Sequence, residues 1–417
     1  MLDTLPIVFV LAGLVFYVVL GGADFGAGLW QLLAGRGAPA KRIRDHAHHA
    51  MGPVWEANHV WLIFVLTVLW TAYPTVFASI ASTLSIPFFL AAIGIVLRGG
   101  AYALRSGTRT AREQRTVETV LSVSSILTPF ALGLIVGAIA GERVPEGNAA
   151  GDLVTSWLNP LSITIGLIAV AFSAYLAAVF LSGDAVRRGE AGLAERFRAR
   201  AVVSGAIAGV AAVAGLVALR SDAHDLYHEL VFGRGLPALV VSVLAGLATL
   251  GLVRRRRYEP ARYTAALAVA AVIAGWALAQ EPYLLEGVTI SDAAAPRDTM
   301  IALIVAVIAG GIILFPALAV LFRMTLAGHL SPGEAAADAP GEGRPPPTGA
   351  TLVARIATAC LVAGLGFLTV ADTGWAHAIG VAALFGFAVL GAAALIAPEL
   401  SEAGDERGHP GVDKPTR

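Results

Sequence analysis

The sequence is poor in charged residues and has a single cysteine. Asp, Glu, Lys and Arg make up 14% of its 417 residues, whereas a soluble domain averages about 25%. Hydrophobic residues make up 57%, and the mean hydropathy is +0.75. The formal net charge is zero, which argues against nucleic acid as a partner, and Cys360 alone cannot form an intrachain disulfide. This composition predicts an integral membrane protein.

The sequence also lacks the repeated two-residue alternation of membrane β-strands, which argues against a β-barrel. It has instead eleven apolar runs, each near the roughly 20 residues that a helix needs to cross a bilayer. The first run is too long for the core of a signal peptide and has no basic start, so we expect it to be retained. We therefore predict an all-α polytopic membrane protein with helices near 6–33, 53–73, 75–97, 117–140, 157–181, 201–219, 236–253, 263–280, 299–322, 351–371 and 376–397.

Lys and Arg fall almost entirely in alternate connections between these runs. The other connections, which alternate with these basic ones along the chain, are acidic and hold only four of the 29 basic residues. Because basic connections stay in the cytoplasm, we expect the N-terminus outside and the C-terminus in the cytoplasm. The basic segments are 34–52, 98–116, 182–200, 254–262, 323–355 and the C-terminal tail.

One break in composition divides the chain. Residues 327–350 are rich in Pro, Gly and Ala and cannot bury a core, which is typical of a flexible linker. We therefore expect a membrane core at 1–326, an appended two-helix hairpin at 351–397, and a disordered cytoplasmic tail at 398–417.

Most apolar runs contain no ionisable residue, and the exceptions are Asp24, Glu56 and His59. A charge well inside hydrocarbon costs roughly 3 kcal/mol, so such residues usually face a protein interior or a water-filled path. Glu56 and His59 are three residues apart, on one helix face. The pattern favours a proton relay built from these three residues. The alternatives are anchoring at the interface, where a first-turn Glu is favoured, and a haem or metal ligand role for His59.

Four further residues are candidates for supporting such a relay. Trp55, Asn58 and Trp61 lie in the stretch GPVWEANHVWL, residues 52–62, where an amide and two indole N–H groups could orient water. Tryptophan near a membrane boundary also occurs simply as an anchor. Arg98 ends the third run, where it could snorkel to the boundary or hold a carboxylate or a quinone headgroup.

Asp24 lies in the glycine-rich stretch LGGADFGAG. Gly22 and Gly26 are four residues apart, a spacing typical of close helix packing. Packing explains the glycines but not the acid, which favours a functional role for Asp24.

Two histidine-containing stretches have metal-like spacing: DHAHHAM at 45–51 and HDLYH at 224–228. Both lie at helix starts or in loops, where histidine is easily solvated, so we expect no metal site. A b-type haem usually takes two axial ligands, His with His or Met. Of nine histidines, only His59 lies within an apolar run, so we expect no haem held by this chain's own ligands.

Four stretches, in this order, resemble the signature stretches of subunit II of cytochrome bd-type quinol oxidases: GGADFGAG, GPVWEANHVWL, LRGGAY and ALAQEPYLLEGVTISDAAAP. The resemblance covers residues 1 to about 326 and implies nine core transmembrane helices, with the hairpin as an addition. It implies a complex in the lipid of the bacterial plasma membrane that oxidises quinol and reduces O2 to water. Subunit I of such complexes carries haem b, haem d and the quinol site. Subunit II packs against it, usually holds no haem, and in some members binds a structural quinone.

The chain departs from the common family forms, which are close to DGFDLGVG and GPVWDGNEVWL. Gly21 takes the place of the first acid, so only Asp24 remains of that pair, while Glu56 replaces an Asp and His59 a Glu or Gln. The resemblance implies that the Glu56 region is an access element, for protons or oxygen, to the haems of subunit I. The alternatives are a secondary transporter or channel, which predicts interrupted helices in paired positions, and a purely structural membrane subunit.

Overall fold

The computed structural model describes residues 2–35, 37–51, 55–105 and 110–326, together with the stretches 356–357, 359–361, 363–364, 379–387 and 389–390. Within these helices, the side chains of a few residues, among them Trp55 and Glu56, are outside the description. The chain divides into two units after His329, and each is described by itself.

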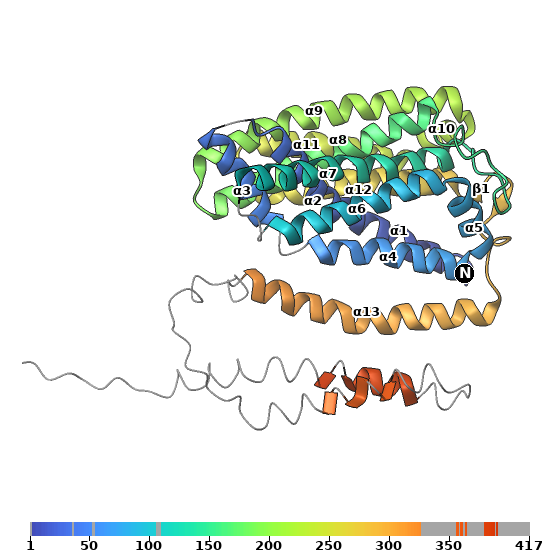
Figure 1. Ribbon diagram of the computed structural model, residues 1–417. Helices are drawn as coiled ribbons and strands as arrows, with labels where there is room; N and C mark the ends of the chain where they lie inside the picture. Colours follow the sequence, from blue (N-terminus) through green and yellow to red (C-terminus); the bar gives the residue numbers. More distant parts are fainter. Residues whose placement is uncertain are drawn as a thin grey trace, which may run out of the picture. The chain divides into compact units, whose positions relative to one another are not determined.

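The first unit is a bundle of long apolar helices (Figure 1). Within the described residues, eight helices are long and apolar enough to span a membrane, and α4 (Trp55–Ala72) is a slightly shorter apolar helix. The predicted class, an all-α polytopic membrane protein, is confirmed. The eight are the continuous rod of α1 (Leu5–Phe16), η1 (Tyr17–Gly21) and α2 (Gly22–Leu32), then α6 (Ser85–Arg105), α7 (Ala111–Ala140), α8 (Pro160–Arg187), α9 (Ala191–Asp222), α11 (Leu236–Arg254), α12 (Tyr258–Gln280) and α13 (Arg297–Leu326).

Short elements close the two ends of this bundle. Figure 1 shows α5, α10 and β1 at the same end as the N-terminus, and α3 at the opposite end. The two strands form one antiparallel pair, in which Tyr283 lies opposite Thr289 and Leu285 opposite Val288. The short elements are α3 (Ala38–Met51), α5 (Pro74–Thr83), α10 (His224–Val231), β1 (Tyr283–Leu285) and β2 (Val288–Thr289).

Several helices begin where the sequence supplies a start signal. Pro74 and Pro160 occupy the first turns of α5 and α8, where the missing N–H of proline leaves no hydrogen bond unmade. Asn159 caps α8 by accepting a hydrogen bond from the Ser162 N–H at 2.9 Å. Thr110 and Glu113 form a reciprocal capping box at the start of α7.

The single helix expected at 75–97 is wrong, because α5 and α6 share that region and Leu84 separates them. The apolar residues of α5, such as Val76 and Ile80, pack in a cluster at the N-terminal end of the bundle and do not form a span of their own. Its Ser79 hydroxyl accepts a hydrogen bond from the Gly147 N–H at 3.0 Å. The spanning helix therefore begins about ten residues later than predicted, and it ends later too.

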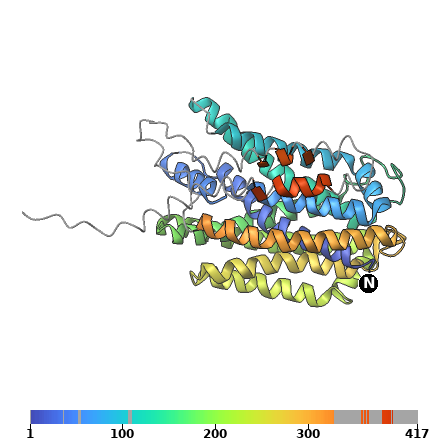
Figure 2. The same ribbon diagram turned by 90° about the horizontal axis from the view of Figure 1, so that it is seen from below.

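Helix α2 lies in the interior of the bundle, between α7 and α8 (Figures 1 and 2). A Cβ atom at Gly26 would overlap the backbone carbonyl of Ser173 on α8, and one at Gly22 would lie 3.5 Å from the Ser173 hydroxyl. The predicted packing role of Gly22 and Gly26 is confirmed. This close approach places the neighbouring Asp24 in the interior.

The second unit contains helical residues between 356 and 364 and between 379 and 390. The two stretches approach through small residues, because a Cβ at Gly364 would lie 2.7 Å from the Leu384 side chain and 3.1 Å from the Gly380 carbonyl. The predicted linker at 327–350 and tail at 398–417 lie outside the described residues, so those boundaries remain predictions.

Candidate functional site

A buried ion pair joins Asp24 on α2 to Arg98 on α6. The Arg98 Nη2 lies 2.6 Å from the Asp24 Oδ1, and each side chain is only 1% exposed. The same nitrogen donates to the backbone carbonyl of Asp24 at 2.9 Å. Burying two charges is costly unless they pair and are hydrogen-bonded; here they pair directly, while the Asp24 Oδ2 and the Arg98 Nε have no hydrogen-bond partner among the described residues.

Arg98 is therefore not a boundary residue. The sequence suggested that it ends its helix, but α6 continues to Arg105, which leaves Arg98 two turns inside. The Lys and Arg count of the connection at 98–116 loses this one residue. Of the functions considered for Arg98, the structure shows one: Arg98 binds a carboxylate, that of Asp24.

Ser125 and two aromatic rings complete the surroundings of Arg98. Its Nη1 donates to the Ser125 hydroxyl, which in turn donates to the Leu121 carbonyl at 2.5 Å. The guanidinium carbon lies 5.1 Å from the ring centroid of Phe25 and 5.3 Å from that of Tyr102, distances suited to cation–π attraction. The set Asp24, Arg98 and Ser125 is called the Asp24–Arg98 cluster below.

Gly28 makes room for this cluster. A Cβ atom at position 28 would overlap the Ser125 hydroxyl and come within 3.1 Å of the Arg98 Nη1. Sequence reasoning found Asp24 and Arg98 but missed Ser125. A signal was available, because Ser122, Ser124, Ser125 and Thr128 lie within the apolar run of α7 and all are buried.

His59 lies beside the cluster, as the relay prediction requires. Its ring centroid is 6.0 Å from that of Phe25 and 6.1 Å from that of Tyr17. The Phe25 ring thus lies against both His59 and the Arg98 guanidinium. The structure thus brings together three of the predicted residues, Asp24, His59 and Arg98, from α2, α4 and α6.

Asn58 connects α4 to the irregular turn in the first helical rod. Its side-chain amide donates to the Leu20 carbonyl at 3.3 Å, and Leu20 belongs to η1, a π-helical turn. Such turns interrupt the regular hydrogen bonding and often occur at functional sites. Tyr17, which begins η1, is 3% exposed. Asn58 thus holds the segment that places Tyr17 against His59.

The structure describes the remaining predicted residues only in part. Trp61 stacks on Phe16 at 4.5 Å between centroids and also lies 6.4 Å from Phe315 of α13, so it packs helices together. Trp55 and Glu56 belong to the first turn of α4, but their side chains lie outside the described residues. The relay roles of all these residues remain proposals.

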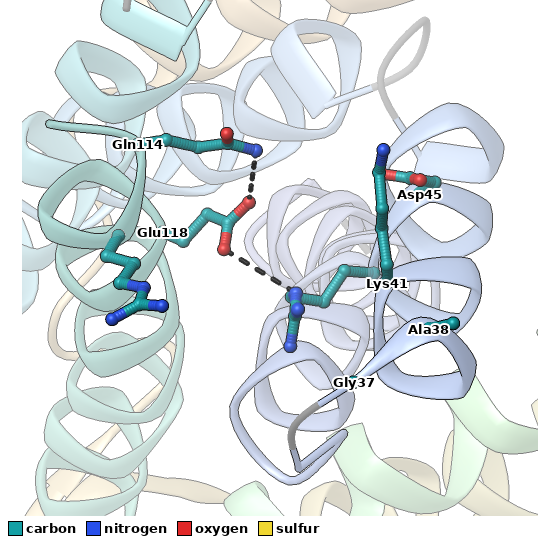
Figure 3. Close-up of a pocket in the computed structure, with 8 residues that line it drawn as sticks. Gly37, Ala38, Lys41, Asp45, Gln114 and Glu118 are labelled. Atoms are coloured by element: carbon teal, nitrogen blue, oxygen red, sulfur yellow. Dashed lines mark hydrogen bonds and ion pairs between the residues drawn. The ribbon is translucent and has the colours of Figure 1, made fainter. Parts of the chain in front are cut away.

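A hollow of about 350 Å³ lies at the α3 end of the bundle, between α3 and the start of α7 (Figure 3). Figure 3 shows Glu118 pointing from α7 toward α3. Its carboxylate accepts from Gln114 at 3.0 Å and pairs with Arg44 at 3.5 Å. The hollow is open and several charged side chains line it, and the sequence, which gave this segment as a simple connection, did not predict it.

The two histidine stretches are parts of helices. In α3, the His46 Nε2 lies 3.1 Å from the Leu181 carbonyl, and burial lowers the pKa of His46. In α10, His224 and His228 lie against the rings of Tyr227 and Phe232. Among the described residues, no group of three His, Cys, Asp or Glu side chains is placed to hold a metal ion.

Fold and site together define a polytopic helical membrane subunit with one charged, hydrogen-bonded cluster in its interior. The family model for cytochrome bd terminal oxidase subunit II matches residues 2–325. The chain therefore belongs to the cytochrome bd terminal oxidase subunit II family, and it is part of an oxidoreductase complex. The transporter and channel alternative finds no support in this assignment.

Individual relatives agree with the family. The chain is 23% identical to a protein of Bacillus subtilis (strain 168) provisionally named cytochrome bd menaquinol oxidase subunit II, over 77% of this chain and 95% of that one. It is 23% identical to the cytochrome bd ubiquinol oxidase subunit 2 of the same strain, over 60% and 72%. Among solved structures, it matches a chain of the bd oxidase from Geobacillus thermodenitrificans with a TM-score of 0.61 and 25% identity, covering 78% of this chain and 98% of that one.

The family implies haems in the complex, but the described residues do not fit a haem. His59 lies between the rings of Tyr17 and Phe25, whereas the buried Met300 belongs to a separate cluster with Tyr73 at the N-terminal end of the bundle. The described His59 and Met300 are therefore not placed as a ligand pair. That this chain holds no haem remains a prediction.

Proposed function

We propose that this chain works as subunit II of a quinol:O2 oxidoreductase in the bacterial plasma membrane. In this proposal it packs against a subunit I that carries haem b, haem d and the quinol site. The family assignment over residues 2–325 supports the complex, as do relatives named for menaquinol and ubiquinol oxidases. A structural quinone at Arg98 is not part of the proposal, because Asp24 and Ser125 already occupy its guanidinium.

We further propose that the chain provides a proton route to subunit I, and the Asp24–Arg98 cluster is the observation that carries this proposal. Reduction of O2 to water consumes protons, and a route through hydrocarbon needs groups that bind and release them. Asp24 and Arg98 are the two members of the cluster that carry charge, and both are buried in the bundle interior. His59, whose imidazole is the side-chain type that titrates nearest to neutral pH, lies against the Phe25 ring, which the Arg98 guanidinium also contacts.

The proposed route begins at the basic end of the bundle and follows α4. Helix geometry places positions 56 and 59 on one face, so a proton taken up at Glu56 passes next to His59. From His59 it reaches the carboxylate of Asp24, whose Oδ2 has no hydrogen-bond partner among the described residues. Arg98 balances the charge of Asp24 between proton transfers. In the final step the proton passes from this chain into subunit I.

A purely structural role is the second candidate, and the direct pairing of Arg98 with Asp24 favours it. Such a pair, joined to Ser125, holds α2, α6 and α7 together whether or not protons move. The two candidates differ at Glu56. A structural subunit tolerates the loss of a proton-releasing group there, whereas a relay does not.

Co-purification tests the proposed complex. A tag after the C-terminal tail should recover a second, haem-bearing subunit, with an absorption spectrum of haem b and haem d. The chain expressed alone should show no haem spectrum. Stoichiometric haem in the isolated chain that disappears in His59→Ala would contradict the proposal and make His59 an axial ligand.

Reporter fusions test the proposed orientation, which rests on the distribution of Lys and Arg. A fusion at Gly147 should report the outside and one at Arg188 the cytoplasm. The opposite result at either site would reverse the assignment of the two ends of the bundle, and with it the starting point of the proton route.

A further inference from the structure

The turn between α11 and α12 concentrates positive charge more than any other described connection. It contains four consecutive arginines, Arg254 to Arg257, and all four are exposed. Arg256 pairs with Glu195 of α9 at 3.4 Å. Within the part of the chain that the structure describes, Arg254, Arg255 and Arg257 form no ion pair.

Several other arginines at this end of the bundle are neutralised by carboxylates. The pairs are Arg42 with Glu190, Arg44 with Glu118, Arg187 with Asp184 and Glu259, Arg198 with Glu195, and Arg262 with Asp184. The turn is thus an unbalanced cluster in a chain whose total formal charge is zero.

The backbone holds this cluster compact. The Arg257 N–H bonds to the Leu252 carbonyl at 2.9 Å and the Arg256 N–H to the Val253 carbonyl at 3.1 Å. Arg256 has a φ of +59°, a left-handed conformation that usually favours glycine. The chain therefore reverses without a spacer residue, and the four arginines stay on one tight turn.

An apolar face of α11 leads directly to these arginines. Leu244 and Leu247 are each 61% exposed. Arg254, the last residue of α11, follows Leu247 by seven residues, which places it on the same helix face, two turns on. Tyr263 of α12, 76% exposed, adds an amphipathic ring of the kind found at membrane interfaces. Along α11, exposed apolar side chains are thus followed by guanidinium groups.

We propose that the turn at 254–257 binds the headgroup of an acidic phospholipid whose acyl chains lie along Leu244 and Leu247. Guanidinium groups bind phosphate through paired hydrogen bonds, and clustered arginines beside a membrane helix attract acidic lipids. A free phosphate ion would use the arginines but not the apolar face. The continuity of the two surfaces is what points to a lipid.

Two triple variants separate a specific site from general attraction of charge. The site variant is Arg254→Gln/Arg255→Gln/Arg257→Gln. The matched control is Arg112→Gln/Arg188→Gln/Arg196→Gln, which removes the same number of charges from exposed arginines scattered over α7, α8 and α9. Like the site arginines, these three form no ion pair among the described residues.

The measurement is the amount of phosphatidylglycerol bound to the purified complex, counted by native mass spectrometry across a titration. We expect the site variant to bind at least tenfold more weakly than the wild type, and the control to bind within twofold of it. Phosphatidylcholine should not compete, and neither should inorganic phosphate. Equal weakening in both variants, no weakening in either, or full displacement by inorganic phosphate would overturn the proposal.

Discussion

The two halves of the helical core, before and after about residue 183, are similarly apolar in sequence but differ in how their side chains are buried. Among the described side chains, nearly all buried polar ones lie before residue 183, and only Ser204 and Thr249 lie beyond it. Correspondingly, 61% of the residues in the apolar window of α7 are buried, against 17% for α11 and 11% for α13. Helices α7 and α8, whose windows are 61% and 50% buried, make the interior of this subunit, whereas α9, α11 and α13 of the second half expose most of their surface to lipid or to another chain.

This difference shows what hydropathy does and does not report. The windows of α7 and α11 have similar mean hydropathies of 2.0 and 2.3, because lipid and a helix interior favour the same side chains. The informative residues are the few polar ones inside apolar runs. A hydroxyl or a charge in such a run needs a protein partner, and in α2, α6 and α7 that partner is present.

The largest expected effect comes from breaking the buried ion pair. Asp24→Ala leaves Arg98 as an uncompensated charge in the interior, which costs about 3–5 kcal/mol. We expect little assembled complex and a clearly lower midpoint of thermal unfolding for what remains. The measurement is the yield of haem-replete complex together with that midpoint.

A surface pair and a double variant control this experiment. Asp222→Ala removes a partner of Arg143 at a partly exposed bridge of 3.2 Å and should cost less than about 1 kcal/mol. Asp24→Asn/Arg98→Gln removes both buried charges and should recover part of the lost yield. If Asp24→Ala assembled as well as Asp222→Ala, the contrast between the two halves would be wrong.

A smaller effect is expected from adding one methyl group where helices touch. Gly26→Ala forces α2 away from the Ser173 backbone, and overpacking of this kind costs about 1–3 kcal/mol. Gly246→Ala on α11 meets no atom within 4 Å and should be neutral or stabilising by up to about 1 kcal/mol. Thermal unfolding of the two variants checks this. Equal destabilisation would mean that α11 is packed as tightly as α2.

The smallest effect is expected from removing the second unit. Truncation after Ala327 deletes the predicted linker and hairpin, which the family match at 2–325 does not include. Quinol oxidase activity per haem should stay close to that of the full chain. Failure of the truncated chain to assemble with its partner would show that the hairpin belongs to the core.

The sequence predicted the class of fold and the most important residues of the site. Asp24 and His59 could be found because an ionisable side chain in an apolar run is expensive and therefore rare. Gly22 and Gly26 could be found because their spacing reports close packing. All of these signals are local, and each was read within one helix.

Features that depend on pairing between distant segments could not be predicted. The surroundings of Arg98 depended on where α6 ends, and the predicted run at 75–97 stopped eight residues before the end of the helix at Arg105. Ser125 lies 27 residues from Arg98 in the chain, and only the packing of α6 on α7 brings them together. The π-helical turn at Tyr17 leaves no mark in the composition of the first run.

The most direct test of the proposed proton route is oxygen consumption per haem d in the purified complex carrying Glu56→Gln. Glutamine keeps the size and hydrogen bonding of glutamate but cannot release a proton. Glu56→Asp, which restores the residue common in the family, is the matched control. The proton route predicts an assembled, haem-replete Glu56→Gln complex whose turnover falls at least tenfold, while Glu56→Asp stays active. Turnover of Glu56→Gln at the wild-type rate would contradict it and leave the Asp24–Arg98 cluster with a structural role alone.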